Sequence, residues 1–559
     1  MPNTKKLLSI TNLKKYFPIA KSSIFTKEQL YVRANEDITL DIMQGETLGL
    51  VGESGCGKST LGRTILQLYD QTAGTTMYYG RNIDDFAPSY VKETLQNAKK
   101  MIATYKKKEE NAQALKAECD KLGDEASFFQ IQNANLAIAE AETAKQNVAK
   151  ILGGFMALND PTEGANLLLK KHNISLKMAR IRHEISKNFA DIDLQKSNIE
   201  ELSADAEKNA GKISSGNEAI KKLESEREKL EVSLDTLGST FLNIDKEIKA
   251  LKAKYADNAA FAEYEKLLDD GIDLSRLKYS EMRLLRKDLQ IIFQDPYSSL
   301  NPRMTIGQII EEGLVNFNFF KHGSSQMKEY ILDIMRQCGL QDYMIHRYPH
   351  QFSGGQRQRI CIARALAVNP KFVVCDECVS ALDVSIQSQI INLLEELKEK
   401  QNLTYLFISH DLSVVRYISD RIGVMYLGNI VEFGDAATVF KDPRHPYTVA
   451  LLSSIPTTDA DTVNTKERII LEGNIPSPIR PPEGCKFHTR CYMACDKCKR
   501  VPPPYVEVNP GHFVACHFLD KKLDGDGKFL FDVNTQKGGK FDSAQNSEAI
   551  NDKPSESEA

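Results

Sequence analysis

The stretch Gly52-Glu-Ser-Gly-Cys-Gly-Lys-Ser59 decides the fold that this sequence predicts. It matches the pattern G-x-x-x-x-G-K-[ST], a glycine-rich loop whose backbone N–H groups surround phosphate oxygens. The apolar run 47–51 before it predicts a short buried strand, and the residues from 60 to 69 are compatible with a helix. That helix would add its positive N-terminus to the phosphate site. The order of strand, loop and helix indicates an α/β fold that binds a nucleotide.

Each residue of this loop has an expected part in holding ATP. The glycines allow backbone conformations that bring N–H groups close to the phosphate oxygens. Lys58 is expected to reach the β- and γ-phosphates, and the Ser59 hydroxyl to ligate Mg²⁺. The residues expected to bind ATP here are Gly52, Glu53, Ser54, Gly55, Cys56, Gly57, Lys58, Ser59 and Thr60.

A second apolar run, 372–375, is followed by the carboxylates Asp376 and Glu377. This pattern predicts a buried strand that ends in two acids. We expect Asp376 to hold Mg²⁺ through water, and Glu377 to orient or deprotonate the attacking water. Two acids at a strand end can also be plain surface charges, but a phosphate loop in the same chain favours the catalytic interpretation.

The composition excludes several classes of protein. A chain of 559 residues exceeds one compact core, so about two to four units are expected. Charged residues make up 26% and apolar residues 42%, as in globular proteins. The sequence shows neither an apolar run of about 18 residues nor a secretory signal, so a cytoplasmic chain is expected. The net charge of −4 gives no basic footprint for nucleic acid.

The composition also predicts five segments. Residues 1–86 and 281–455 alternate short apolar runs with turns, which indicates two parts of one ATPase domain. Residues 87–280 are rich in Ala, Lys, Glu, Leu and Asn and predict an all-helical insertion. A Cys-rich C-terminal region is expected over 456–520, and a polar tail over 521–559 is expected to be disordered.

Apolar residues in the insertion recur at coiled-coil spacing, most regularly over 220–255 and less fully over 101–122. The runs 153–154 and 161–164 form the expected reversal of one antiparallel helical hairpin. Kinks are expected near Gly123 and over 211–216. An arm of ~50 residues would reach about 75 Å. A compact helical bundle is the alternative interpretation.

Further motifs resemble those of the ATP-binding cassette (ABC) ATPases. Phe352-Ser-Gly-Gly-Gln356 is similar to the family signature, and Ser380-Ala-Leu-Asp383 is similar to its D-loop. Gln294 stands where the family has its Q-loop glutamine, His410 where it has a switch histidine, and Tyr16 where an aromatic residue stacks on adenine. The resemblance implies a RecA-like core, an antiparallel β-subdomain and a helical signature subdomain, interrupted by the coiled-coil insertion.

The same resemblance implies a role for each residue. The expected catalytic set is Glu377, His410, Gln294 and Lys58, and the expected Mg²⁺ site is Ser59, Gln294 and Asp376. The residues that would serve the ATP of the opposite subunit are Ser353, Gly354, Gly355 and Gln356, and Asp383 belongs to the D-loop.

The chain departs from the family pattern at Cys378, where proline usually follows the two acids. Cysteine does not fix φ as proline does. Because the catalytic carboxylate is retained, activity is expected to survive, with a looser turn at Glu377.

A narrower resemblance is to the ATPase subunits of oligopeptide and dipeptide importers. It rests on the stretches 49–64, 293–303, 445–448 and 471–478, and this chain resembles the second of the two ATPase types. The resemblance implies a sibling ATPase, two transmembrane permease subunits and an extracytoplasmic binding protein as partners. It also implies a peripheral place on the cytoplasmic face of the membrane. Some relatives carry nickel or other solutes instead of peptides.

Cysteines gather near the C-terminus. Cys485, Cys491, Cys498 and Cys516 resemble an iron–sulfur motif found in many peptide-importer ATPases, and four thiolates suit a 4Fe–4S cluster. Cys495 is an additional thiol. Zinc is the rival, since thiolates and histidines such as His488, His512 and His517 also bind it. Free reduced thiols are the third interpretation.

The insertion leaves two functional interpretations. A coiled coil inside an ABC ATPase also resembles the ATPases of chromosome maintenance and DNA repair, but there the coil follows the Q-loop, whereas here it precedes Gln294. Within an importer the insertion is expected to dock an unknown partner or the sibling ATPase, or to be a tolerated addition without a role.

Overall fold

The computed structural model describes residues 5–21, 29–203, 206–320, 324–455 and 469–520. The chain divides into two compact units, one of residues 1–48 and 57–409, the other of 49–56 and 410–559. The strand β3 (Thr47–Val51), which feeds the phosphate loop, runs from the first unit into the second. Within the described ranges, no helix is long and apolar enough to cross a membrane.

In the first unit, an antiparallel sheet forms the β-subdomain. Its strand order is β2-β1-β4-β5. The central β1 pairs through Ile10 with Leu40 of β2 and with Thr76 of β4. The strand β5 pairs Ile272 with Tyr78 of β4, so the chain leaves the sheet and returns to it on neighbouring strands. The bounds are β1 Lys6–Pro18, β2 Tyr31–Met43, β4 Ala73–Tyr78 and β5 Ile272–Asp273.

Three parallel strands of the same unit hold the predicted acids. They are β6 (Leu289–Ile292), β7 (Phe372–Asp376) and β8 (Thr404–Ile408), with β7 paired to both neighbours. Every residue of β7 and β8 is buried, as expected for parallel strands that are covered on both faces. The helix α1 (Lys58–Ile65) packs closely here, because a Cβ on Gly62 would come within 2.9 Å of Val374.

The signature subdomain of this unit is helical. Its helices are α10 (Ile306–Asn316), α11 (Ser325–Gln337), α12 (Gly354–Leu366) and α13 (Val384–Gln401). The apolar face of α11, with Ile331 and Met335, is buried, which is why these short helices hold together. The strand β7 follows α12 and precedes α13 in the sequence. The signature at the start of α12 and the two acids at the end of β7 therefore belong to consecutive elements of the chain.

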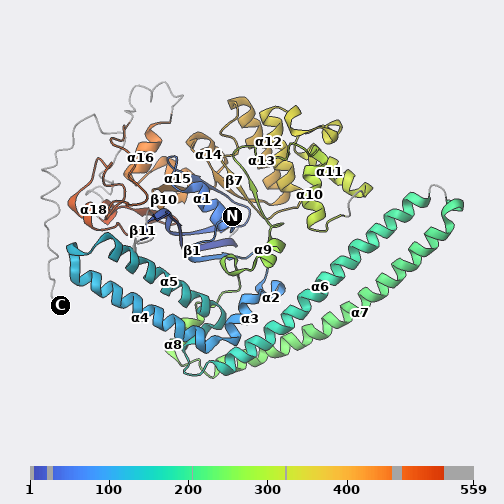
Figure 1. Cartoon of the computed structure of the whole chain (residues 1–559), viewed down its shortest axis with the longest axis horizontal. Coiled ribbons are helices and arrows are strands. Elements are labelled where there is room, and N and C mark those ends of the chain that lie inside the picture. Colours follow the sequence, from blue (N-terminus) through green and yellow to red (C-terminus); the bar gives the residue numbers. More distant parts are fainter. Residues whose placement is uncertain (1–4, 22–28, 204–205, 321–323, 456–468, 521–559) are drawn as a thin grey trace. The chain divides into compact units, whose positions relative to one another are not determined.

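The insertion forms two helical hairpins (Figure 1). The first pairs α4 (Ala98–Leu122) with α5 (Phe128–Leu152), and the second pairs α6 (Thr162–Leu202) with α7 (Ala206–Ala253). With 48 residues, α7 is about 72 Å long. Short helices connect them to the sheet: α2 (Ile83–Phe86), α3 (Ser89–Gln96), α8 (Ala259–Glu265) and α9 (Tyr279–Leu285).

The expectation of one hairpin with its reversal at 153–164 and a kink near Gly123 is wrong. Gly123, with a positive φ of 52°, ends α4, and Ser127 begins α5 with a capping box, so the chain reverses there. The turn at 153–161 connects the two hairpins instead. The kink expected over 211–216 is also wrong, because α7 continues through it. Packing against α6 outweighs the cost of about 1 kcal/mol for each helical glycine.

The second unit contains an antiparallel sheet in the order β11-β12-β10-β9. Glu432 of β10 pairs with Val514 of β12, so the Cys-rich region adds two strands to this sheet. The elements are β9 Arg421–Tyr426, β10 Asn429–Asp435, β11 Tyr505–Asn509, β12 His512–Ala515, α14 Leu412–Ile418, α15 Ala436–Lys441, α16 Pro446–Ser453 and α18 Asp496–Arg500. The predicted tail 521–559 lies outside the described residues.

A small core at the base of the insertion should fix the second hairpin. Phe155 is fully buried, its ring lies against Gly164, and it meets Phe261 edge-on with 5.6 Å between ring centroids. Changing Phe155→Ala should therefore lower the free energy of unfolding by about 3–5 kcal/mol, measured by denaturant titration of helical circular dichroism. Leu242→Ala, at an α7 side chain that is 60% exposed, should change it by less than about 0.5 kcal/mol. Equal losses in the two variants would contradict the assignment of this core.

Candidate functional site

The phosphate loop is anchored separately in each unit. In the first unit Gly57 precedes α1 with φ of 106°, and a Cβ there would lie 2.2 Å from the Ala34 carbonyl oxygen. Asn35, fully buried, donates from Nδ2 to the Gly57 carbonyl oxygen at 3.1 Å. Only glycine tolerates this approach. Lys58 and Ser59 follow at the start of α1, and Lys58 is buried.

In the second unit the loop is held through Glu53. Arg490 donates to both carboxylate oxygens of Glu53, at 2.7 and 3.1 Å. The Glu53 backbone N–H donates to the Tyr447 hydroxyl at 2.9 Å. Hydrogen bonding to Glu53 raises the pKa of Arg490, so the guanidinium stays charged. At Gly52, a Cβ would lie 2.2 Å from the Met425 carbonyl oxygen, so this end of the loop is also closely packed.

Sequence reasoning missed both anchors of Glu53. Tyr447 lies within the motif 445–448, which in the sequence only narrows the resemblance. Arg490 directly precedes Cys491, in a stretch interpreted only for its thiols. Both residues stand in stretches that resemble the family, but sequence spacing does not reveal that they contact Glu53.

The first unit brings the predicted acids to the end of β7. Asp376 is 1% exposed, and Arg63 of α1 donates from Nη2 to its Oδ2 at 3.1 Å. Among the described residues, the other oxygen, Oδ1, has no hydrogen-bond partner although it is buried. A buried carboxylate oxygen without a donor fits a residue that accepts from Mg²⁺-bound water.

Glu377 and Gln294 lie together, as the catalytic set requires. Gln294 donates from Nε2 to Glu377 Oε2 at 2.9 Å. Glu377 has a φ of 48°, which is uncommon for a residue other than glycine, and its N–H donates to the Ile408 carbonyl oxygen at 3.0 Å. Ser380 Oγ donates to the Glu377 carbonyl oxygen at 2.9 Å. Cys378, which follows this left-handed residue, is buried.

The signature lies at the exposed start of α12. Ser353 caps the helix by accepting from the Gln356 N–H, and Gln356 accepts from the Ser353 N–H. Ser353 and Gly354 are exposed, so the N–H groups of this helix start can meet an anion from another molecule. In the D-loop, Asp383 is exposed and precedes α13. His410 belongs to the second unit and precedes Asp411, whose side chain caps α14.

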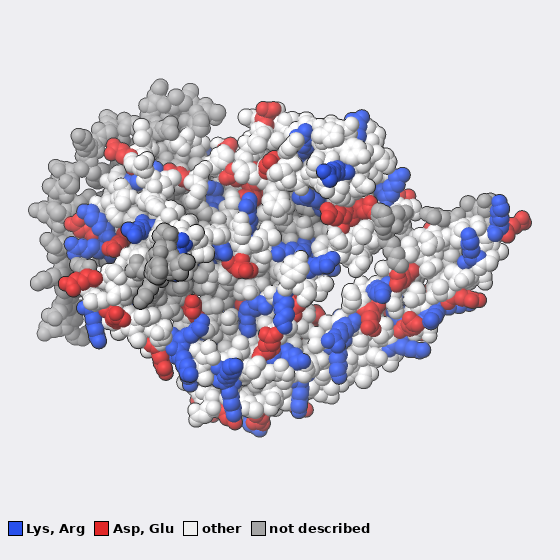
Figure 2. Space-filling view, in the orientation of Figure 1, with Lys and Arg blue, Asp and Glu red and all other residues white. Residues whose placement is uncertain are grey.

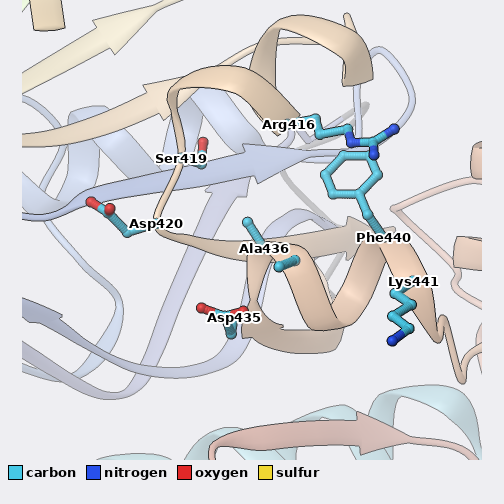
Figure 3. A pocket seen from close by; sticks show the side chains of 8 residues that line it. Arg416, Ser419, Asp420, Asp435, Ala436, Phe440 and Lys441 are labelled. Atoms are coloured by element: carbon cyan, nitrogen blue, oxygen red, sulfur yellow. The ribbon is translucent and has the colours of Figure 1, made fainter. Parts of the chain in front are cut away.

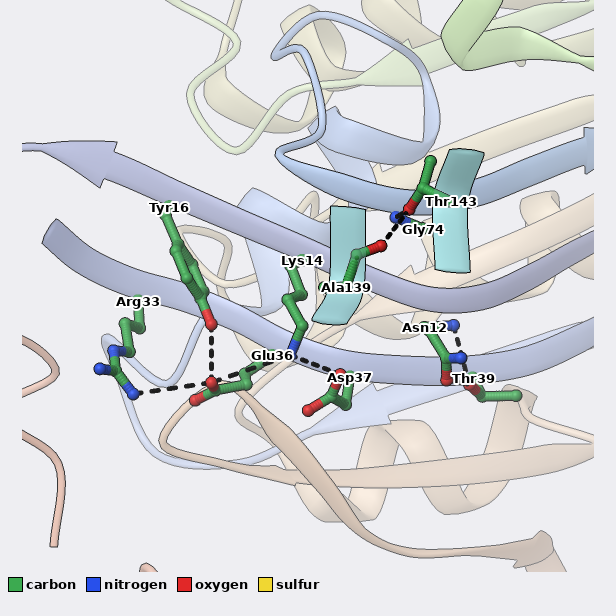
Figure 4. Close-up of polar contacts among 10 residues, drawn as sticks. All are labelled: Asn12, Lys14, Tyr16, Arg33, Glu36, Asp37, Thr39, Gly74, Ala139 and Thr143. Atoms are coloured by element: carbon green, nitrogen blue, oxygen red, sulfur yellow. Dashed lines mark hydrogen bonds and ion pairs between the residues drawn. The ribbon is translucent and has the colours of Figure 1, made fainter. Parts of the chain in front are cut away.

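Tyr16 is packed into the β-subdomain rather than left open (Figure 4). Its side chain is only 6% exposed, and its hydroxyl donates to Glu36 Oε1 at 2.6 Å. Burial, and then the charge of Glu36, raises the pKa of Tyr16. The rings of Tyr16 and Tyr31 lie 6.1 Å apart, and the Arg33 guanidinium lies 5.8 Å from the Tyr16 ring centroid.

The cysteines of the second unit are near one another but do not form a ligand set. Burial raises the pKa of Cys498 to about 11 and that of Cys516 to about 12, with neighbouring thiols contributing. Cys495 and Cys498 sulfurs are 3.6 Å apart. Across the described ranges, no group of three His, Cys, Asp or Glu side chains is arranged to hold a metal ion. The thiols as placed therefore do not fit a cluster.

The three histidines offered for zinc have other partners. The Nε2 atom of His512 lies 2.8 Å from Glu432 Oε1. His517 Nε2 lies 2.7 Å from the Val501 carbonyl oxygen, and His488 Nδ1 lies 2.8 Å from the Cys485 carbonyl oxygen.

A hollow in the second unit lies apart from the predicted residues (Figure 3). Its lining includes acidic and basic side chains and no residue of the predicted ATP set. The lining residues are Arg416, Ser419, Asp420, Asp435, Ala436, Ala437, Phe440 and Lys441.

Comparisons with known proteins find matches for the segment that holds the phosphate loop and the two acids, and for the C-terminal region. The family model described as "ABC transporter" matches residues 35–250 and 248–380. The model described as "Oligopeptide/dipeptide transporter, C-terminal region" matches residues 431–498. The oligopeptide transport ATP-binding protein AppF of Bacillus subtilis (strain 168) is 52% identical over 252 residues, 45% of this chain and 76% of that protein. The oligopeptide transport ATP-binding protein OppF of Haemophilus influenzae (strain KW20 / Rd) is 50% identical over 247 residues, 44% and 74% of the two chains.

The Glu53–Arg490 contact should support ATP binding. Arg490→Ala removes two charge-assisted hydrogen bonds, so the affinity for ATP should fall about tenfold, measured by equilibrium titration with a fluorescent ATP analogue. Arg490→Lys should lose less, since it keeps the charge but not the bidentate geometry.

The matched control is Lys499→Ala. Lys499 lies in the same region, is exposed and pairs with Asp496 at 2.8 Å, so its loss should leave ATP affinity unchanged. An Arg490→Ala protein that keeps its fold and its ATP affinity would refute the anchoring role.

Proposed function

This chain belongs to the ABC transporter family of ATPases, and we propose that it hydrolyses ATP to drive import of oligopeptides or dipeptides. The observation that carries the substrate class is the 52% identity to a protein named for oligopeptide transport, together with the match of residues 431–498 to a peptide-transporter C-terminal region. The second unit adds support, because that same region anchors Glu53 of the phosphate loop.

Hydrolysis in this proposal relies on positioning and charge. The phosphate loop and Lys58 hold the triphosphate, while Ser59 and Asp376 hold Mg²⁺, which neutralises charge on the phosphates when bound. Glu377 orients or deprotonates water, and Gln294, 2.9 Å from it, positions that carboxylate. His410 contacts the γ-phosphate. Each of these roles comes from the family resemblance and is proposed here for the residues as numbered.

The cycle requires a second ATPase. ABC transporter ATPases dimerise and work with membrane permease components. The phosphate loop and the exposed start of α12 would serve different ATP molecules, so each subunit completes the site of the other. We propose a heterodimer with a sibling ATPase beneath two transmembrane permeases, on the cytoplasmic face of the membrane, supplied by an extracytoplasmic binding protein.

The alternative in chromosome maintenance or DNA repair gains no support. The relatives named above are transport proteins. On the face shown in Figure 2, Lys and Arg side chains are interspersed with Asp and Glu along the α6–α7 hairpin. A DNA-binding surface instead has Lys and Arg clustered in a basic patch or stripe.

Glu377→Gln should separate ATP binding from hydrolysis. The amide keeps the size of the side chain but removes the base, so phosphate release should fall by about 10²–10⁴-fold while ATP affinity stays within about twofold. The assay uses the complex copurified from native membranes and reconstituted in proteoliposomes with its binding protein, and ATP-dependent uptake of a labelled oligopeptide should stop as well.

Glu396→Gln is the control for this substitution, since Glu396 is an exposed residue of α13 that pairs with Lys400. Normal hydrolysis by Glu377→Gln would reject the catalytic assignment. Normal hydrolysis by the wild-type complex with uptake of Ni²⁺ but not of peptide would reject the substrate class alone.

For the C-terminal cysteines we propose a thiolate-ligated centre, a 4Fe–4S cluster first and zinc as the alternative. The family resemblance of Cys485, Cys491, Cys498 and Cys516 supports it, while their arrangement in the structure does not. Anaerobically purified protein should contain about four iron and four sulfide per chain, measured by metal and acid-labile sulfide analysis. Stoichiometric zinc without sulfide would favour the alternative, and neither metal would leave free thiols.

A further inference from the structure

The helix α1 connects the end of the phosphate loop to the end of β7. Ser59, the expected Mg²⁺ ligand, and Arg63 stand four residues apart on this helix, so they lie on the same face of it. The helix approaches the parallel strands closely at Gly62, where a Cβ would come within 2.9 Å of Val374. A long side chain beside Gly62 can therefore reach Asp376, the last residue of β7.

Arg63 holds one oxygen of the Asp376 carboxylate and leaves the other without a partner. Its Nη2 donates to Asp376 Oδ2 at 3.1 Å, and the two side chains form an ion pair in which Asp376 is 1% exposed and Arg63 is 34% exposed. Although burial alone would lower the pKa of Arg63, its contacts with Tyr69 and Asp376 raise it, so the guanidinium stays charged. Within the part of the chain that the structure describes, Asp376 Oδ1 has no hydrogen-bond partner.

This arrangement fixes which oxygen of the carboxylate faces away from Arg63. The terminal torsion of an aspartate is broad and roughly two-fold, so a carboxylate that nothing holds can exchange its two oxygens. A hydrogen bond from a charged donor is short and strong, and it removes that freedom. With Oδ2 held, Oδ1 is the oxygen that remains to accept from Mg²⁺-bound water. Without the guanidinium, the buried carboxylate would be unpaired and would turn to other contacts.

We propose that Arg63 is a positioning residue for the Mg²⁺ site. It holds Asp376 through Oδ2, so that Oδ1 is presented to the water that Mg²⁺ would carry. Because Ser59 and Arg63 share α1, one helix supplies the hydroxyl ligand and also orients the carboxylate on the neighbouring strand. Arg63 has no contact with the phosphates in this role. The role rests on the proposed function, since it requires ATP with Mg²⁺ at this phosphate loop.

The test separates binding of the metal from binding of the nucleotide. The full-length chain is titrated with a fluorescent, non-hydrolysable ATP analogue, once with Mg²⁺ and once with EDTA. Arg63→Met should weaken binding with Mg²⁺ by about tenfold, as is usual when a residue that orients a metal ligand is lost, and should change binding with EDTA by less than about twofold. Arg63→Lys keeps the charge but has no planar fork, so it should recover part of the affinity.

A double-mutant cycle tests whether Arg63 acts through Asp376. Asp376→Asn should by itself weaken binding with Mg²⁺, and it leaves no buried charge unpaired when Arg63 is removed. Arg63→Met should therefore cause no further loss in the Asp376→Asn chain. A full additional loss in that chain would show that Arg63 acts by another route and would overturn the proposal.

Arg286→Met is the matched control. Arg286 donates to the carbonyl oxygens of Leu66 and Gln67, just beyond the end of α1, so this substitution removes a guanidinium from the same helix without changing the partner of Asp376. The ratio of the affinities with Mg²⁺ and with EDTA should stay as in wild type.

Three results with Arg63→Met would overturn the proposal. They are an equal loss with Mg²⁺ and with EDTA, no change in either, and tighter binding with Mg²⁺, which is expected if the guanidinium only repels a nearby cation. A wild-type chain that does not bind the ATP analogue under either condition would instead overturn the proposed function on which the role of Arg63 rests.

Discussion

An ion pair between Arg81 and the buried Asp288 closes the ATPase domain around its insertion. Arg81 precedes the insertion and Asp288 follows it, and the guanidinium donates to both carboxylate oxygens at 2.5 and 2.9 Å. The Asp288 side chain also accepts from the Tyr78 hydroxyl at 3.1 Å, and its carbonyl oxygen accepts from the Phe372 N–H that begins β7. One residue thus joins the β-subdomain, both ends of the insertion and the strand that carries the catalytic acids. Removal of the Arg81 guanidinium would leave the buried Asp288 carboxylate without its ion-pair partner, which is strongly destabilising.

This closure explains why so long an insertion leaves the ATPase fold intact. Tyr78 and Ile272 pair as neighbours in the sheet, so the insertion begins and ends at one place. Its two hairpins bring their own cores, around Leu152 in one case and Phe155 in the other. The insertion therefore does not draw on the apolar residues of the parallel strands. Thr143 and Lys150 of α5 make polar contacts with the sheet.

The sequence was sufficient for the elements that carry chemistry, because their signals are local. The strands before the loop and before Asp376 are buried runs flanked by special residues, and both formed as expected. The pairing of the long helices was not predictable from spacing, since every amphipathic helix offers the same apolar stripe to any partner. Gly123 and Gly153 each have a φ of 52°, yet one makes a hairpin tip and the other a connection between hairpins. Nor does spacing show that Arg33 meets Gln132, 99 residues away.

The phosphate loop and the residues around Arg33 are held by contacts that sequence spacing does not reveal. These contacts differ in what they require of the chain. The phosphate loop has two fixed supports, the close approach of Gly57 to Ala34 in one unit and the Arg490–Glu53 pair in the other. The first is steric and depends only on the absence of a Cβ, so any chain with this fold can have it. The second needs a guanidinium from the C-terminal region, and the contact of Arg33 with α5 needs the insertion. Two elements added to the common ATPase therefore contact it through arginines, Arg490 with Glu53 of the phosphate loop and Arg33 with Gln132 of α5, because a planar guanidinium can satisfy a carboxylate or an amide.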